Sequence, residues 1–181
     1  MKRFIKEFIK NPRTIGSVIP SSSRLIHSML KHIDFSRDIT IVEFGPGIGN
    51  FTKEILKKVS KDSHVYLFEI KDNFVEHLQK ISDPRLTVIH DGAENIEKHL
   101  GGKKADYIIS GLPFGSLPKE LTNKILKETH RNLKHNGIFL QFQYFLQNKK
   151  DIFTIFKNHS ITWQPVNFPP AFIYKCKKIH F

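Results

Sequence analysis

The sequence predicts an α/β fold in which a mostly parallel, doubly wound sheet is covered by helices on both faces. Short apolar runs rich in β-branched and aromatic residues alternate along the chain with amphipathic helical patterns. The first clear run, Ile39–Phe44, is followed by three glycines at alternate positions, Gly45, Gly47 and Gly49, and then by a helical pattern. A strand, a glycine turn and a helix form the opening unit of such a sheet.

Length and composition favour one soluble globular domain over residues 1–181. Apolar residues make up 39% of the chain, and no apolar run approaches the roughly 20 residues that span a bilayer. Charges interrupt Met1–Lys10, which argues against a secretory signal. The single cysteine, Cys176, provides neither a disulfide framework nor a metal-binding spacing. We therefore expect a cytoplasmic protein without a metal site.

The chain is strongly basic, and its first residues are both basic and apolar. Lys and Arg number 29 against 17 Asp and Glu, a net charge of +12, which attracts nucleic acid or an anionic membrane. Met1–Lys10 places four apolar side chains on one helical face and lysines around them. This pattern predicts a short amphipathic helix that lies in a membrane interface or docks on the protein's own core. The apolar residues are Phe4, Ile5, Phe8 and Ile9.

A turn-rich segment links this predicted helix to the first strand. Residues 11–23 contain Pro12, Gly16 and Pro20, and we expect them to form either an ordinary loop or a lid over the glycine turn. Ser22 or Ser23 can cap a following helix that runs to about His32. The inward residues predicted for this helix are Leu25, Ile26, Met29 and Leu30.

The spacing of the glycines and the preceding acid indicate the class of cofactor. The third glycine comes one residue too early for a dinucleotide fingerprint, and Asn50 occupies the fingerprint position. Glu43 lies at the carboxyl end of the strand, where it would repel a pyrophosphate but suits a cationic ammonium or sulfonium. Glycine also lets a ligand lie close to the backbone at a helix N-terminus.

A second acid strengthens the prediction of a nucleoside-containing cofactor. Residues 63–70 form a second predicted strand, and Glu69 lies 20 residues after Gly49. A doubly wound nucleotide fold places at this distance an acid that accepts hydrogen bonds from ribose hydroxyls. The third predicted strand, Leu86–His90, is followed by Asp91, Gly92 and Ala93.

The rest of the chain completes a mixed sheet. A fourth predicted strand, Ala105–Ser110, runs into Gly111-Leu112-Pro113-Phe114-Gly115, beside the point where open α/β sheets bind ligand. Two final strands form the predicted antiparallel edge. The remaining predicted elements are helices at 72–81, 119–133 and 149–156 and strands at 137–145, 161–166 and 172–176.

With these residues assembled, the chain resembles the bacterial phospholipid N-methyltransferases, a family of class I methyltransferases. The resemblance rests on FIKNPRTIGSVIPSSS, VEFGPGIGNFT, FEI, SGLPFGSLP and PPAFIYKCK. It implies a Rossmann-like fold with a seven-stranded mixed sheet and an N-terminal amphipathic helix. It implies S-adenosylmethionine as donor, and phosphatidylethanolamine or its methylated intermediates as acceptor on the way to phosphatidylcholine. It also implies a peripheral location on the inner face of the cell membrane, at an anionic surface.

The resemblance also implies roles for individual residues. Three residues, Glu43, Gly45 and Gly47, would line the methionine end of the cofactor, in the turn that Gly49 completes. Glu69 would hold the ribose. The adenine would lie by Asp91, Gly92 and Ala93, and the reacting methyl group would be bordered by Ser110 and Leu112.

Tyr144, near the end of the fifth predicted strand, is our candidate to orient or deprotonate the acceptor amine. Methyl transfer from a sulfonium requires mainly alignment of donor and acceptor, and the attacking amine must be neutral. A packing role for this tyrosine is the alternative.

An RNA adenine N6-methyltransferase is the alternative function, and only under it is nucleic acid the partner. Ser110–Phe114 is similar to the N-x-P-[YF] motif of those enzymes, whose aromatic residue stacks on a flipped base. Serine in place of the usual Asn or Asp opposes this alternative, and so does the end of the chain after its last strand. A non-catalytic binding module is a third possibility, opposed by the intact set of Glu43, the glycines and Glu69.

Overall fold

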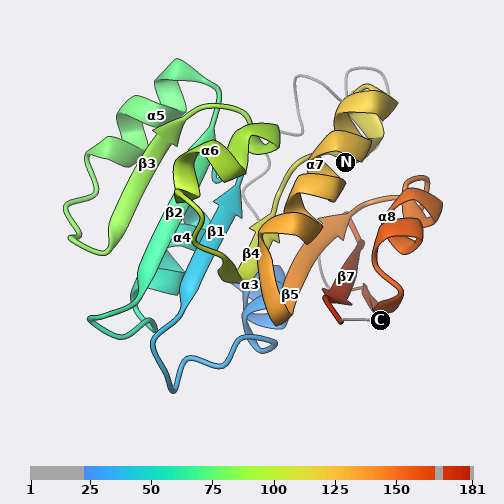
Figure 1. Cartoon of the computed structure of the whole chain (residues 1–181), viewed down its shortest axis with the longest axis horizontal. Helices are drawn as coiled ribbons and strands as arrows, with labels where there is room; N and C mark the ends of the chain where they lie inside the picture. Colours follow the sequence, from blue (N-terminus) through green and yellow to red (C-terminus); the bar gives the residue numbers. More distant parts are fainter. Residues whose placement is uncertain (1–22, 166–168, 180–181) are drawn as a thin grey trace.

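The computed structural model describes residues 23–165 and 169–179, and it confirms the predicted seven-stranded mixed sheet. The predicted helix at Met1–Lys10 and the link up to residue 22 lie outside the described residues. The strand order is β3-β2-β1-β4-β5-β7-β6; the first five strands in sequence are parallel, and β7 is antiparallel to both of its neighbours (Figure 1). The strands are β1 (Thr40–Phe44), β2 (His64–Glu69), β3 (Leu86–His90), β4 (Ala105–Ser110), β5 (Leu133–Gln143), β6 (Asn158–Gln164) and β7 (Ala171–Lys177).

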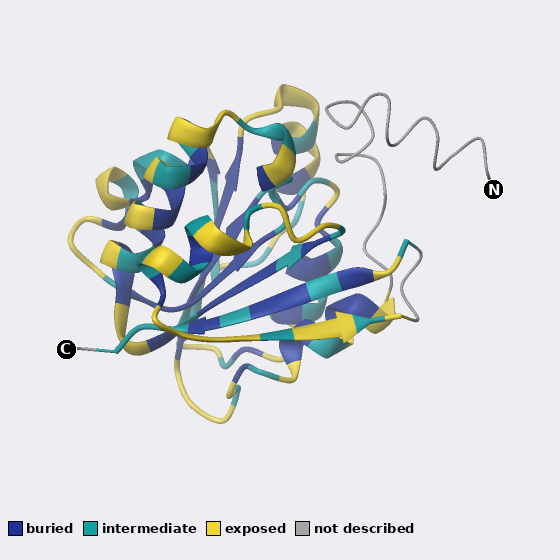
Figure 2. Cartoon of the chain, turned by 90° about the vertical axis from the view of Figure 1, so that its right-hand side faces the viewer, coloured by how far each residue is buried: buried dark blue, intermediate teal, exposed yellow. Residues whose placement is uncertain are grey.

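Helices cover both faces of the sheet, so that its central strands are buried while the edge strand β6 is largely exposed (Figure 2). One apolar cluster packs the sheet against α3 (Ser23–Leu30), α4 (Asn50–Leu56) and α5 (Asp72–Gln79). A second cluster packs the other face against α6 (Ile96–Leu100), α7 (Lys119–Asn132) and α8 (Lys149–Ile155). Two short 3-10 turns, η1 (Ala93–Asn95) and η2 (Phe114–Ser116), precede α6 and α7.

The predicted bounds agree with the structure for some elements and differ for others. The third and fourth strands have the predicted bounds, and all four predicted inward residues of α3 are buried. By contrast, β5 begins at Leu133 rather than Gly137, and β6 begins at Asn158 rather than Ile161. The first residues of β6 are polar and exposed, so no apolar pattern in the sequence marks them as a strand. They are a strand because they pair with β7. The short helix α6 was not predicted.

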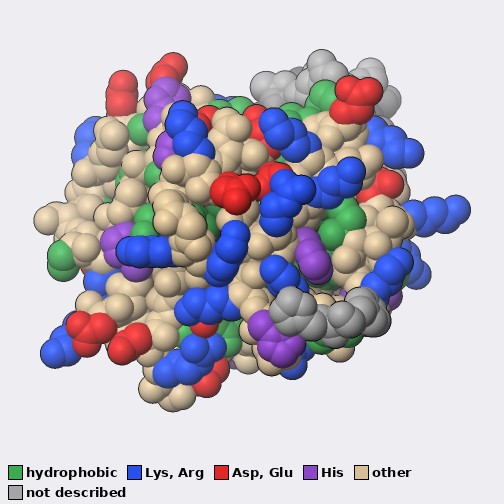
Figure 3. Space-filling view, in the orientation of Figure 1, with side chains coloured by type: hydrophobic (Ala, Val, Ile, Leu, Met, Phe, Trp, Pro, Cys, Tyr) green, Lys and Arg blue, Asp and Glu red, His purple; other side chains and the backbone are tan. Residues whose placement is uncertain are grey.

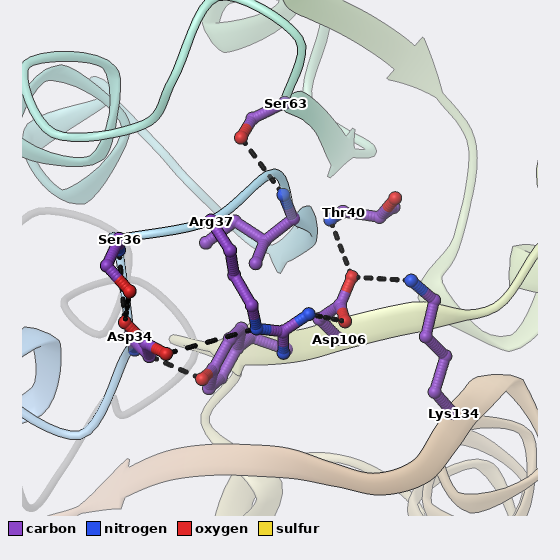
Figure 4. Close-up of polar contacts among 9 residues, drawn as sticks. Asp34, Ser36, Arg37, Thr40, Ser63, Asp106 and Lys134 are labelled. Atoms are coloured by element: carbon purple, nitrogen blue, oxygen red, sulfur yellow. Dashed lines mark hydrogen bonds and ion pairs between the residues drawn. The ribbon is translucent and has the colours of Figure 1, made fainter.

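A buried carboxylate ties three strands together at their amino ends, opposite the glycine turn. Asp106 accepts hydrogen bonds from the Thr40 N–H at 2.8 Å, from Lys134 Nζ at 2.8 Å and from Arg37 Nη1 at 3.1 Å (Figure 4). Burial by itself would raise the pKa of Asp106, but these donors hold it below its usual range. The start of β4 is thereby fixed to β1 and β5.

Within residues 23–165 and 169–179, no helix combines the length and apolarity that crossing a bilayer requires. The same residues contain no group of three or more His, Cys, Asp or Glu side chains placed to share a metal ion. Cys176 is buried in β7, and this burial raises the pKa of its thiol to about 12.

Candidate active site

The glycine turn after β1 has the geometry that its sequence predicts. Gly45, Gly47 and Gly49 have φ angles of 65°, 56° and 78°. Residues that carry a Cβ atom rarely adopt such positive φ angles. A Cβ atom on Gly45 would lie 2.9 Å from Leu112 Cδ2, whereas one on Gly47 would meet nothing within 4 Å. The first glycine therefore allows close packing against the loop after β4, and the second leaves its backbone open to a ligand.

Glu43 lies at the end of β1 with its side chain almost completely buried. Its Oε2 accepts a hydrogen bond of 2.7 Å from the Thr52 hydroxyl on α4. The pKa of Glu43 is raised to about 7, mainly by burial; the Thr52 hydrogen bond opposes this rise, and the nearby Glu69 adds to it. A carboxyl group in this state is only partly ionised at neutral pH, and a cationic neighbour would favour its ionised form.

Glu69 at the end of β2 is fixed to the glycine turn. Its Oε2 accepts the Gly47 N–H at 3.2 Å, and its Oε1 accepts the N–H groups of Ile70 and Lys71 at 2.9 and 3.0 Å. Two acids that are 26 positions apart in the sequence, Glu43 and Glu69, thus meet at one turn. The structure brings together the residues predicted to hold the methionine end and the ribose.

Asp91 is engaged by its own loop at the end of β3. Its carboxylate accepts hydrogen bonds of 2.7 Å from the Gly92 N–H, from Asn95 Nδ2 and from His99 Nε2. The His99 bond, followed by those from Asn95 and Gly92, holds the pKa of Asp91 well below its usual range. Ala93 is buried behind this loop. The recognition of adenine by these three predicted residues remains a prediction, and His99 was not anticipated.

The loop after β4 is fixed by two glutamines that were not among the predicted site residues. The carbonyl of Leu112 accepts hydrogen bonds from Gln141 Nε2 at 3.0 Å and from Gln143 Nε2 at 3.1 Å. Ser110 is fully buried, and its Oγ accepts the Leu112 N–H at 3.2 Å. The available signal was the alternation of two glutamines at the end of an otherwise apolar strand, which is unusual for a buried position.

Tyr144 lies just beyond β5 and is half-buried. Its ring makes an edge contact with Phe142, with centroids 6.0 Å apart, and belongs to the apolar cluster beneath α3 and α4. This placement is compatible with packing, and the predicted contact with an acceptor amine is untested.

The motif expected of an RNA adenine methyltransferase is altered in two ways. Counted back from Phe114, the four-residue motif places Gly111 at the Asn position, and not Ser110 as predicted. No side-chain amide is therefore present at that position. Phe114, the position of the stacking aromatic, is 1% exposed and packs in the cluster beneath α7.

Comparison with known proteins identifies the family. The model of the ribosomal RNA adenine dimethylase family matches residues 8–149 of this chain. The chain belongs to this family. The family uses S-adenosylmethionine, and the chain is accordingly an S-adenosylmethionine-dependent class I methyltransferase. This confirms the class and the donor implied by the resemblance, but the matching family model is that of the RNA dimethylases.

Two curated relatives act on different acceptors. An ornithine lipid N-methyltransferase of Singulisphaera acidiphila is 28% identical, and the alignment covers 97% of this chain and 95% of that protein. A ribosomal RNA small subunit methyltransferase A of Hydrogenobaculum is also 28% identical, but over 67% of this chain. The chain spans 46% of the length of that second relative.

Solved structures share the fold at lower identity. An rRNA methylase from Streptococcus thermophilus superposes with a TM-score of 0.65 at 18% identity, covering 90% of this chain and 99% of that one. At this identity the similarity establishes the fold alone.

The residues of the turn fit S-adenosylmethionine, because Gly47 leaves open space, Glu43 favours a nearby cation and Glu69 provides acceptors for ribose hydroxyls.

Proposed function

We propose that this protein transfers methyl groups from S-adenosylmethionine to the amine of a lipid headgroup at an anionic membrane surface. The proposed acceptors are phosphatidylethanolamine and its methylated intermediates, leading towards phosphatidylcholine. The observation that carries the proposal is the alignment with the lipid N-methyltransferase over 97% of the chain. That alignment extends beyond residue 149, where the dimethylase match ends, and so includes β6 and most or all of β7.

The loop after β4 supports a lipid amine over an adenine. Gly111 provides no amide to hold an adenine amino group, and Phe114 is buried rather than free to stack on a flipped base. An aliphatic amine needs no stacking surface. It needs only alignment with the methyl group and loss of its proton before attack.

The residues of the site divide the work of this reaction. When bound, S-adenosylmethionine supplies an electrophilic methyl group on a sulfonium. Glu43 provides negative charge at the glycine turn, and Glu69 fixes that turn through the Gly47 N–H. Gln141 and Gln143 hold the carbonyl of Leu112 and so set the shape of the loop beside the acceptor. Tyr144 is the proposed group for orienting the amine.

An acceptor competition tests this function. The purified full-length chain is incubated with labelled S-adenosylmethionine and a mixture of phosphatidylethanolamine, dispersed in detergent, and ribosomal RNA. We expect label in the lipid fraction, in mono-, di- and trimethylated headgroups. Label that entered the RNA alone, as dimethyladenosine, would refute the proposal.

RNA adenine dimethylation is the second candidate, because it is the activity named by the family model. The basic surface is compatible with it, since Lys and Arg side chains are spread over the middle of the face that α6 and α7 cover (Figures 1 and 3). The competition experiment therefore distinguishes lipid methylation from RNA methylation in a single reaction mixture.

A further inference from the structure

Large apolar side chains are exposed in only a few places. Among the described residues, five large hydrophobic side chains are exposed, and none of them belongs to either buried cluster. Ile70 is 67% exposed and Trp163 is 58% exposed. The five residues, which we call the apolar rim, are Ile48, Ile70, Phe145, Leu146 and Trp163.

The topology places all five residues of the apolar rim at the end of the sheet where the parallel strands have their carboxyl ends. Ile48 lies within the glycine turn after β1, and Ile70 directly follows the end of β2. Phe145 and Leu146 follow the end of β5. Because β1, β2 and β5 are parallel, these ends meet at the carboxyl edge of the sheet.

Trp163 reaches the same edge from the far side of the sheet. Both β5 and β6 are antiparallel to β7, so β6 runs in the same direction as β5 and Trp163 lies near its carboxyl end. The strand register confirms this position, since Trp163 and Gln143 both pair with Phe172 of β7. The apolar rim thus extends along the sheet edge from β2 to β6.

The residues of the rim fit a lipid surface better than a nucleic acid. Aliphatic side chains such as Ile48, Ile70 and Leu146 gain free energy in an acyl environment but contribute little against phosphates and base edges. Tryptophan and phenylalanine are favoured at membrane interfaces, where lysines beside them meet anionic headgroups. Exposed lysines follow the rim at Lys71, Lys149 and Lys150, and the whole chain carries a net charge of +12.

The rim also adjoins the candidate active site. Ile48 is flanked by Gly47 and Gly49, the glycines of the cofactor turn. A bilayer in contact with the rim would therefore bring lipid headgroups to the edge where Glu43, Glu69 and the loop after β4 converge.

We propose that the protein docks on an anionic membrane through the apolar rim, with the carboxyl ends of its parallel strands facing the lipid. This inference rests on the proposed function and adds the surface and the orientation of contact. Docking inserts Trp163, Phe145 and Leu146 at the level of the headgroups and leaves the Asp106 edge of the sheet in water.

Trp163 is the single tryptophan of the chain and therefore reports directly on docking. The full-length protein is titrated with vesicles of phosphatidylethanolamine and phosphatidylglycerol, with or without bromine on the acyl chains. We expect a blue shift of the emission and quenching by the brominated lipid. Unchanged emission from protein that sediments with the vesicles would overturn the rim as the docking surface, as would a response to ribosomal RNA but not to vesicles.

A pair of matched variants provides the second readout. The double variant Phe145→Ser/Leu146→Ser should weaken vesicle binding by about tenfold or more, because two apolar side chains lose their lipid contact. Lys103→Ser, near the opposite edge, should retain binding within about twofold, because a single remote charge contributes little across a screened distance. Equal losses in the two variants would contradict the proposal.

Methyl transfer to detergent-dispersed phosphatidylethanolamine separates this inference from the function beneath it. The double variant should retain micellar activity and lose vesicle activity. Methylation of lipid in micelles, together with Trp163 emission that does not change on adding vesicles, would contradict docking through the rim but support the proposed function. Absence of lipid methylation in micelles would remove the proposed function, and the emission of Trp163 would still decide whether the rim contacts lipid.

Discussion

At the scale of a single residue, we expect Glu43 to couple proton binding to donor binding. Its pKa of about 7 in the ligand-free protein means that much of the carboxyl is protonated below neutrality. A sulfonium nearby favours the ionised form, so binding of S-adenosylmethionine at lower pH must release a proton. The affinity should therefore rise with pH and level off above neutrality.

Calorimetric titration with S-adenosylmethionine between pH 5.5 and 8 tests this linkage. We expect the affinity to fall by about tenfold for each pH unit below 7. Glu43→Gln should bind more weakly at pH 8 and lose most of this dependence. A wild-type affinity that is flat with pH, or falls as pH rises, would show that Glu43 does not meet the sulfonium.

A substitution at Gly47 tests whether the glycine turn binds the donor, separately from its effect on the stability of the fold. Gly47 and Gly102 both have positive φ, 56° and 83°, and a Cβ at either position would meet nothing within 4 Å. Alanine should cost about 1–2 kcal/mol of unfolding free energy at each site, because the strain is the same in kind. Only Gly47→Ala should weaken binding of S-adenosylmethionine, by about tenfold or more, since its methyl group occupies the space left for the ligand.

Urea unfolding and calorimetry measure the two quantities in the same preparations. Gly102→Ala serves as the control for backbone strain. Equal donor affinity in the two variants would place the cofactor elsewhere.

At the scale of elements, β4 is held at both of its ends. Asp106 fixes its start, and the glutamine pair, Gln141 and Gln143, fixes the loop beyond its end. Asp106→Ala should reduce the unfolding free energy at pH 7 by about 2–3 kcal/mol, because it removes the acceptor for three donors from a buried site. Asp38→Asn, at an exposed carboxylate nearby, should change it by less than about 0.5 kcal/mol.

The stabilisation by Asp106 depends on pH with a predictable sign. The pKa of Asp106 is lower in the folded protein than in the unfolded chain. Its contribution is therefore fully present above the unfolded pKa and declines as pH falls through the folded value. The difference between wild type and Asp106→Ala in urea unfolding should narrow towards pH 3. A difference that widened in acid would contradict the ion-pair role.

The glutamine pair should affect the acceptor step more than donor binding. Gln143→Met removes one of the two side-chain amides that hold the carbonyl of Leu112 and keeps a side chain of similar length. We expect kcat to fall by about tenfold, with KM for S-adenosylmethionine within about twofold, because Gln143 acts on the carbonyl of Leu112, which we propose lies beside the acceptor, whereas the loop meets the glycine turn through the side chain of Leu112. Gln79→Met, at an exposed glutamine of α5, provides the control. A higher KM for the donor at unchanged kcat would assign the glutamine to the cofactor instead.

At the scale of the whole molecule, the sequence predicted what local patterns encode. Short runs rich in β-branched and apolar residues located β3 and β4 at their observed bounds, although only β4 is buried along its whole length, and the glycines marked the turn between β1 and α4. Glu43 and Glu69 could be assigned together because the spacing of a doubly wound fold is itself a local rule.

The features that were missed depend on contacts between distant residues. The polar start of β6 is a strand only because β7 pairs with it, and Asp106 meets Arg37 and Lys134 only after the sheet forms. Gln141 and Gln143 reach Leu112 from the neighbouring strand, about 30 positions away in the chain. The apolar rim likewise exists only once strand order and direction are known.

Lipid analysis in a host that makes phosphatidylethanolamine but no choline lipids tests whether the glycine turn delivers a methyl group to a lipid amine. Expression of the wild-type chain should produce mono-, di- and trimethylated phosphatidylethanolamine, and Gly47→Ala should produce little or none at equal protein level. An unchanged lipid profile, with new dimethyladenosine in the ribosomal RNA of the same cells, would contradict the claim.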